Sequence, residues 1–125
     1  MTSLQLVSLP MVLFCHQDQY FALEAAYVRR QTAALTVGQK SVSFASLLST
    51  SGTEQALVTQ WLELEGLDGP TWLGLETAAE LVELAATDIY PLPPLLHARR
   101  ELLALRALAW YQGNLVSVLD ARSLV

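Results

Sequence analysis

The most reactive side chains of the sequence do not fall into a pattern that supports catalysis. Cys15 and His16 are neighbours, and neighbouring side chains on a strand point to opposite faces, so they cannot easily form a nucleophile–base pair. His97 is the only other histidine, whereas a zinc site usually needs three or four ligands at a recognisable spacing. The sequence therefore predicts no catalytic residue, no metal site and no cofactor.

Carboxylates and glycines support the same interpretation. Glu76, Glu80 and Glu83 are spaced so that they would share one face of a helix, and paired carboxylates can perform acid–base chemistry. No histidine, lysine or aromatic pocket accompanies them, which favours a solvated acidic face. The glycines lack the spacing of a phosphate-binding loop, and no Gly-Lys-Ser/Thr follows them.

The arginines indicate a contact surface instead. Arg99, Arg100 and Arg106 place three of the seven positive charges within eight residues. Arginine is favoured at protein interfaces, so this cluster is interpreted as a patch for an acidic partner, with a solvated helix face as the alternative. Arg29 and Arg30 form a second pair in an expected strand, where they would point to opposite faces and at most one would meet a given partner.

Three tryptophans stand in strand-like runs: Trp61, Trp72 and Trp110. We expect them to lie in the core or between subdomains, because a large aromatic side chain contributes most when it is buried. If Trp110 and Tyr111 are exposed as a pair, they would instead anchor an interface.

Composition sets the class of protein. The chain has 125 residues, 53% of them hydrophobic and 15% charged, and a net charge of −5. This length predicts one domain over 1–125, and the acidic balance excludes the basic stripe that nucleic-acid binding needs. One cysteine excludes an internal disulfide framework and fits a reducing compartment. No apolar run is long enough to cross a membrane, so we expect a cytoplasmic protein with no membrane insertion. Its high apolar content indicates either an unusually dry core or apolar surface that is hidden against a partner.

Short apolar runs separated by turn residues predict a mainly β fold. We expect a hairpin from 11–15 and 20–23, and another from 105–111 and 115–119 around Gln112-Gly113-Asn114. The composition of 77–86 is typical of a helix, and 95–104 has helical propensity. Asp120 is expected to cap a final helical turn. Further strands are predicted at 42–44, 56–64 and 71–75.

The two halves of the chain resemble each other. Residues 20–24 match 71–76, and 42–44 match 116–118. Such a duplication of short strands predicts two small β-barrels that share one core.

These segments together resemble a known family. Residues 20–29 resemble an aromatic-x-apolar hairpin ending in Val-Arg, 72–75 a Gly-Leu-x-Val strand, and 88–96 a Pro-rich connector. In order and spacing, residues 11–125 are similar to a CheW-like domain, whose members are chemotaxis adaptors. The resemblance implies a fold of two SH3-like five-stranded β-barrel subdomains with short helical segments, and no catalysis.

The first half departs from that family. The stretch that ends in Asn-Leu-Arg-Gly in typical members is reduced here to 36–40, and Ala45-Ser46 stands where the second half has Leu119-Asp120. We expect a shortened first subdomain over 10–53 and a regular second one over 54–125, with strands that can be exchanged between them.

The resemblance implies a non-catalytic adaptor that links the regulatory domain of a chemotaxis-type histidine kinase to chemoreceptors. The alternative is a degenerate module that has lost kinase coupling and acts by self-association, as a homodimer, or in a motility or pilus signalling system. The candidate partner-binding residues are Arg29, Arg30, Arg99, Arg100, Arg106, Trp110 and Tyr111.

Overall fold

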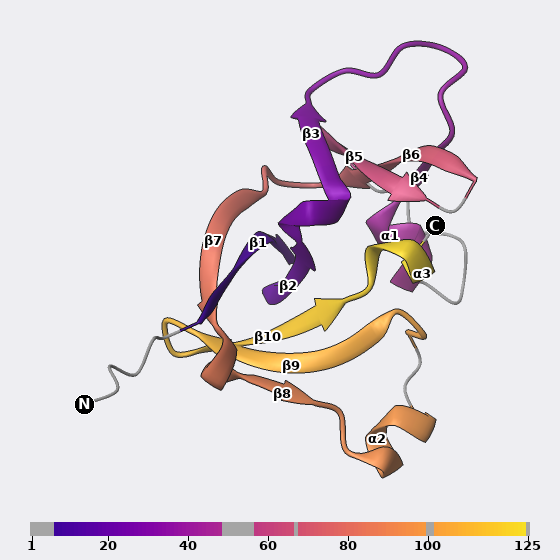
Figure 1. Cartoon of the computed structure of the whole chain (residues 1–125). Helices are drawn as coiled ribbons and strands as arrows, with labels where there is room; N and C mark the ends of the chain where they lie inside the picture. The colour runs from indigo at the N-terminus through magenta and orange to yellow at the C-terminus, as the bar shows by residue number, and fades with distance from the viewer. Residues whose placement is uncertain (1–6, 49–56, 67, 100–101, 125) are drawn as a thin grey trace.

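The fold is built from short strands joined by tight turns (Figure 1). A computed structural model describes residues 7–48, 57–66, 68–99 and 102–124, apart from the side chains of His97 and Arg99. Its strands are β1 (Ser8–His16), β2 (Gln19–Glu24), β3 (Val28–Thr32), β4 (Ser41–Ser43), β5 (Gln60–Gly66), β6 (Gly69–Leu75), β7 (Glu80–Ala85), β8 (Ile89–Pro91), β9 (Leu105–Tyr111) and β10 (Asn114–Leu119). Its helices are η1 (Ala25–Tyr27), α1 (Phe44–Leu48), η2 (Ala86–Asp88), α2 (Pro94–Arg99) and α3 (Ala121–Leu124).

Two of the predicted hairpins form around turns with the same backbone geometry. Between β1 and β2, Gln17 and Asp18 both have positive φ, at 49° and 63°. Between β9 and β10, Gln112 and Gly113 have φ of 50° and 79°. A two-residue turn with both φ values positive matches the twist of the flanking strands, so both hairpins are confirmed.

The prediction of a helix over 77–86 is wrong. Residues 80–85 form the strand β7, which pairs antiparallel with β1. Val82 and Leu84 are buried while Leu81 and Glu83 are exposed, which is the two-residue alternation of a half-buried strand. Pairing with β1 and burial of alternate side chains outweigh the helical propensity of Ala, Leu and Glu, because propensity is a weak preference that tertiary context overrides.

The strands form two sheets. One has six strands in the order β7-β1-β2-β10-β9-β8, and the other has four in the order β3-β5-β6-β4. Each sheet combines strands from both halves of the chain: β7 pairs with β1, and β3 pairs with β5. In each sheet the second strand of a hairpin also pairs in parallel with a later or earlier strand, β2 with β10 and β6 with β4.

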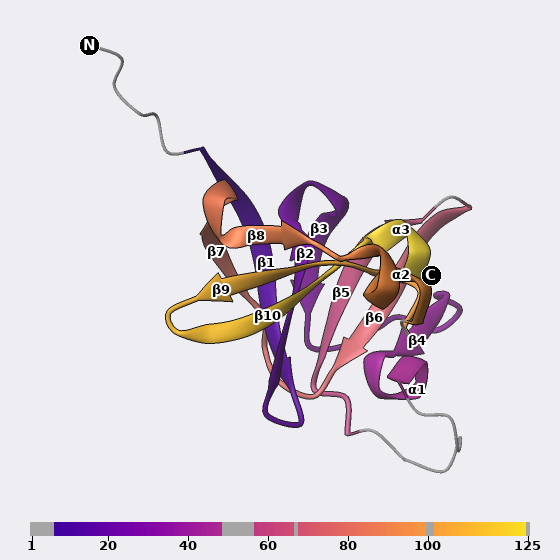
Figure 2. The same cartoon turned by 90° about the horizontal axis from the view of Figure 1, so that it is seen from below.

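The six-stranded sheet curls around one core, and a second core lies between the two sheets (Figures 1 and 2). The first core takes side chains from β1, β2, β7, β9 and β10, among them Met11, Ala22 and Val116. The second joins the other face of β1 and β2 to the four-stranded sheet and α1, through Phe14, Phe44 and other residues. The predicted mainly β fold of curled sheets with short helices is therefore confirmed.

The four-stranded sheet lacks elements that the other sheet has. Residues 92–113 connect β8 to β10 and contain α2 and β9, whereas residues 33–40 alone connect β3 to β4. Among the described strands, β4 has β6 as its only neighbour, in the place where β10 has both β2 and β9. In the described part of the chain, no helix has the length and apolar character needed to cross a membrane.

Candidate protein-interaction surface

Arg29 and Arg30 lie together on β3, and both point away from the core. The pairing of β3 with β5 shifts between Val28 and Arg30, so one extra residue is inserted as a β-bulge. Arg29 forms an ion pair with Glu65, and Arg30 Nε lies 3.2 Å from Glu63 Oε2. The expectation that the two arginines face opposite ways is therefore wrong, because the bulge interrupts the alternation of side chains.

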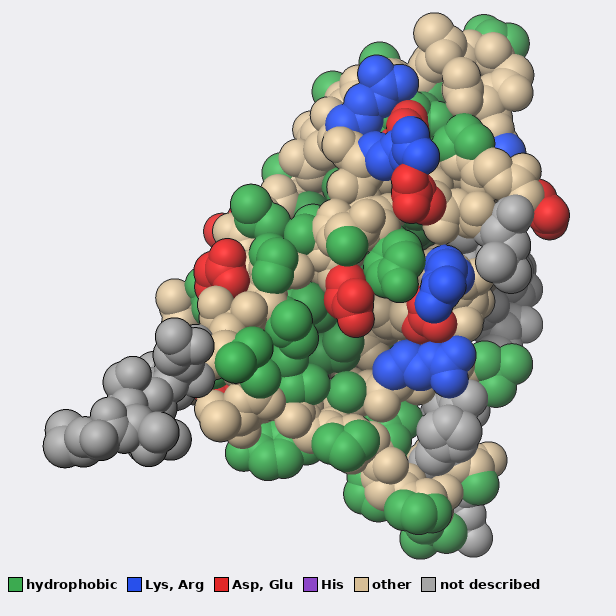
Figure 3. All heavy atoms as spheres, viewed as in Figure 1, with side chains coloured by type: hydrophobic (Ala, Val, Ile, Leu, Met, Phe, Trp, Pro, Cys, Tyr) green, Lys and Arg blue, Asp and Glu red, His purple; other side chains and the backbone are tan. Residues whose placement is uncertain are grey.

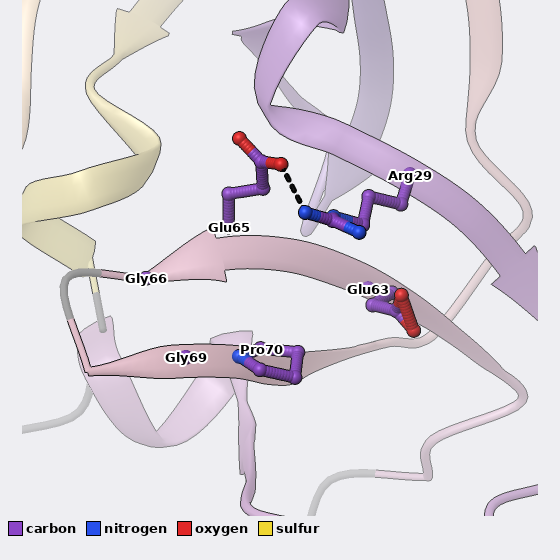
Figure 4. A pocket seen from close by; sticks show the side chains of 6 residues that line it. All are labelled: Arg29, Glu63, Glu65, Gly66, Gly69 and Pro70. Atoms are coloured by element: carbon purple, nitrogen blue, oxygen red, sulfur yellow. Dashed lines mark hydrogen bonds and ion pairs between the residues drawn. The ribbon is translucent and has the colours of Figure 1, made fainter.

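This arrangement borders a cleft of about 320 Å³ (Figure 4). Figure 4 shows Arg29 reaching from β3 toward Glu65 on β5, with the hairpin residues Gly69 and Pro70 opposite. More than half of each arginine side chain is exposed, and such ion pairs contribute only about 0–1 kcal/mol. The ion pair between Arg29 and Glu65 is exposed on both sides and is therefore weak, whereas Glu63 is only 14% exposed beside Arg30.

Arg30 also stacks on an aromatic ring. Its guanidinium carbon lies 5.2 Å from the centre of the Trp72 ring, within the range of a cation–π contact. Trp72 is 4% exposed, as expected for a core residue, and its indole N–H donates a hydrogen bond of 3.1 Å to Gln39 Oε1. The stack fixes where Arg30 presents its charge.

A second group of charges surrounds α3. Arg106 on β9 lies 3.3 Å from Asp120 Oδ2, and it also donates to Ser123 Oγ at 3.1 Å. Asp120 Oδ1 accepts the backbone N–H of Arg122 at 3.1 Å, which confirms the predicted helix cap. Arg122 in turn lies over the ring of Tyr27, so this cluster connects β9, α3 and η1.

Most of the predicted cluster of Arg99, Arg100 and Arg106 falls outside the described residues. Arg99 ends α2, but its side chain is not described, and Arg100 lies outside the described residues. Only Arg106 can be placed on a surface. Its role and those of Arg99 and Arg100 in partner binding stay predictions.

Trp110 and Tyr111 differ in exposure. Trp110 is 50% exposed, while Tyr111 is partly buried and packs against the core inside the six-stranded sheet. Gln112 Nε2 donates to the Tyr111 hydroxyl at 3.2 Å. Of this pair, Trp110 alone therefore has the exposed aromatic surface that an interface anchor needs.

The residues first considered for chemistry occupy structural positions. His16 is buried, with its ring edge-on to Phe44 and its Nδ1 3.7 Å from Glu76 Oε2. Cys15 has a free thiol and is partly buried. Among the described residues, no group of three or more His, Cys, Asp or Glu side chains is placed to hold a metal ion.

Glu80 and Glu83 do not share a helix face, because both lie on the strand β7. Each is exposed, and Glu83 Oε2 accepts a hydrogen bond of 3.0 Å from the Ser8 hydroxyl. They form solvated charges on the outside of the six-stranded sheet.

Glu63 and Glu65 are functional candidates that the sequence analysis did not single out. They alternate on β5, and Glu63 is only 14% exposed next to Arg30. Their spacing of two residues within an apolar run indicates that both lie on the same face of a strand. Their pairing with the arginines of β3 could not be predicted, because it depends on strand neighbours far apart in sequence.

Charge and apolar side chains separate on the molecular surface (Figure 3). In this view Lys and Arg side chains gather over β3 and around α3, with carboxylates between them. Hydrophobic side chains gather toward β7, β8 and β9. Such a division, with charged groups beside an apolar area, is the general arrangement of protein–protein interfaces.

Comparison with known proteins identifies the architecture. No protein-family model matches the sequence, and no curated protein is significantly similar to it. The structure is similar to that of the scaffolding protein TtCheW from Thermoanaerobacter tengcongensis, with a TM-score of 0.76. The match covers 94% of this chain and 92% of that chain at 11% sequence identity. The chain has a CheW-like fold. The CheW-like resemblance seen in the sequence is thus confirmed at the level of the fold.

Proposed function

We propose that this protein is a non-catalytic adaptor that links the regulatory domain of a chemotaxis-type histidine kinase to chemoreceptors through protein–protein contacts. The observation that carries the proposal is the match to the scaffolding protein TtCheW over nearly the whole of both chains. A scaffold fold acts by holding partners at fixed positions, so its working parts are surfaces rather than a pocket.

The arginines of β3 supply one such surface in this proposal. Arg29 and Arg30 project on the same side, half or more exposed, in a chain whose net charge is −5. An acidic segment of the kinase would replace Glu63 and Glu65 as their partner, since bidentate contact with carboxylates is the strength of the guanidinium group. Arg106 and Trp110 on β9 supply a second contact, nearer to the apolar area.

A binding assay tests the proposal directly. The purified chain would be titrated with a CheA-type regulatory domain by isothermal calorimetry, and we expect a Kd below about 100 µM. Changing Arg29 and Arg30 to Gln is expected to weaken binding about tenfold. Arg122→Gln is the matched control, because Arg122 is also exposed, ion-paired and stacked on an aromatic ring. Absence of binding at about 100 µM would contradict kinase coupling, and equal affinity of all variants would remove the arginines of β3 from the contact.

A second candidate function follows from the four-stranded sheet. Because residues 33–40 replace a longer connection, β4 has three residues and one paired side. If the kinase contact of a CheW-like protein depends on this sheet, a shorter sheet would remove that contact. In that case the protein is a CheW-like structural or regulatory module that self-associates or serves a motility or pilus system. Light scattering on the same samples separates the two: a homodimer without kinase binding supports the second function.

A further inference from the structure

The outer face of β8, β9 and β10 carries a row of apolar side chains that the described residues leave largely uncovered. These are Tyr90, Leu108, Trp110 and Leu115, which we call the apolar stripe. Tyr90 lies opposite Leu108, and Trp110 lies opposite Leu115. The two pairs adjoin because Leu108 and Trp110 are two residues apart on β9. Tyr90, Trp110 and Leu115 are each about half exposed, at 51%, 50% and 51%. In Figure 2 these strands pass in front of β1 and β2.

The stripe has no charged residue within it and an opposite charge at each end. Arg106 precedes Leu108 by two residues on β9, next to a bulge in the pairing with β10, and its side chain is about half exposed. At the other end Asp18 lines a cleft of about 370 Å³ together with Leu115 and Ser117. Asp18 belongs to the β1–β2 turn, which reaches β10 because β2 pairs in parallel with it, Tyr20 opposite Val116.

We propose that a second copy of this chain packs on the apolar stripe, with the two stripes antiparallel about a two-fold axis. In a two-fold contact residue i of one copy meets residue j of the other, and j meets i. An apolar row with Arg106 at one end and Asp18 at the other is complementary to itself under that rotation. Each dimer then contains two pairs between Arg106 and the Asp18 of the other copy.

The charge of the chain explains why the contact lies here. At a net charge of −5 two copies repel each other, and the stripe offers an approach free of carboxylates except where Arg106 faces them. An aromatic side chain buries roughly 150–250 Å², so the half-exposed stripe adds about 400 Å² per copy. That is about half of the area that a standard interface buries on each partner, so we expect a weak, reversible dimer.

The contact rests on the second candidate function and gives it a surface. It involves Arg106 and Trp110, the second contact proposed for the adaptor, but not Arg29 and Arg30. The kinase titration with the variants of β3 therefore distinguishes failure of the adaptor from failure of the dimer. Sedimentation equilibrium of the full chain from about 5 to 500 µM tests the dimer. We expect a monomer–dimer equilibrium that Trp110→Ala weakens at least tenfold. Leu81→Ala is the control, since Leu81 is an exposed apolar residue on β7, where it lies opposite Val12 of β1 and not beside a residue of the stripe. A monomer at the highest concentration, or a dimer that Trp110→Ala leaves unchanged, would overturn the proposal.

The orientation is tested by a pair of charge removals. Asn accepts the positive φ of Asp18, so Asp18→Asn leaves the turn intact. We expect Asp18→Asn and Arg106→Gln each to weaken the dimer several-fold, and the double variant to be no weaker than the singles, because both remove the same pairs. Thermal unfolding checks that Arg106→Gln stays folded without its contact to Asp120. Fully additive effects would rule out the antiparallel arrangement.

Discussion

Gly74 occupies a point in β6 where the structure has no room for a methyl group. A Cβ atom there would lie 2.8 Å from Trp61 Cζ3 and 2.9 Å from both methyl carbons of Val58. Trp61 is the residue that pairs with Gly74 across β5 and β6. An ordinary strand glycine is less favourable than alanine by about 0.5–1 kcal/mol, so without these contacts Gly74→Ala would stabilise the protein. Overpacking costs about 1–3 kcal/mol, and we therefore expect a net loss of about 1–2 kcal/mol.

Two measurements test this steric argument: the sign of the change in free energy of unfolding for Gly74→Ala, and its combination with Val58→Ala. Urea unfolding followed by tryptophan fluorescence measures the free energy of unfolding, and the loss would lower the midpoint by about 1 M. Val58→Ala alone removes two half-buried methyl groups and costs about 1 kcal/mol. Combined with Gly74→Ala it also makes room for the added methyl group, so the combined loss is expected to fall about 1 kcal/mol short of the sum. A stabilising Gly74→Ala, or additive losses, would refute the steric account.

Three further predictions concern single side chains, each measured as the change in free energy of unfolding. Phe44 has ring centres 4.8–4.9 Å from two phenylalanines of β1 and β2, so Phe44→Ala is expected to cost about 3–5 kcal/mol; a loss under about 1 kcal/mol would show that α1 is not packed there. Asp120→Ala removes the cap of α3 and is expected to cost about 1–2 kcal/mol, and no change would contradict the cap. Arg30→Lys keeps the charge beside Glu63 but loses the stack on Trp72, for an expected loss of about 0.5–1 kcal/mol; equal stability would mean that charge alone matters.

The hairpins could be predicted because their signals are local. Gln112-Gly113-Asn114 and the polar break at residues 17–19 lie between apolar runs, and the backbone adopts the turn that such residues favour. The cap at Asp120 is equally local, since its partner N–H is two residues away. In each case the interacting groups are close in sequence, so their types and order carry the information.

The errors arose where distant segments decide the structure. Residues 80–85 became a strand because β1 supplies their hydrogen bonds from about seventy positions earlier in the chain. Arg29 and Arg30 face the same way because β5 meets β3 with a shifted register. The local sequence predicts neither the pairing of β7 with β1 nor the register between β3 and β5, since propensity and alternation describe one segment at a time. The apolar stripe was visible only as Trp110, because Tyr90 and Leu115 become its neighbours through pairing across three strands.

Each half of the chain supplies one strand to the sheet of the other half, since β7 pairs with β1 and β3 pairs with β5. The stability of the two sheets is therefore coupled. Neither half contains a complete set of neighbours for its own strands, since β1 needs β7 and β5 needs β3. Such interlocking makes most pairings non-local, and chains of this kind fold slowly, in roughly milliseconds to seconds. It also means that damage to one sheet is shared by the other, so both sheets should melt in a single transition.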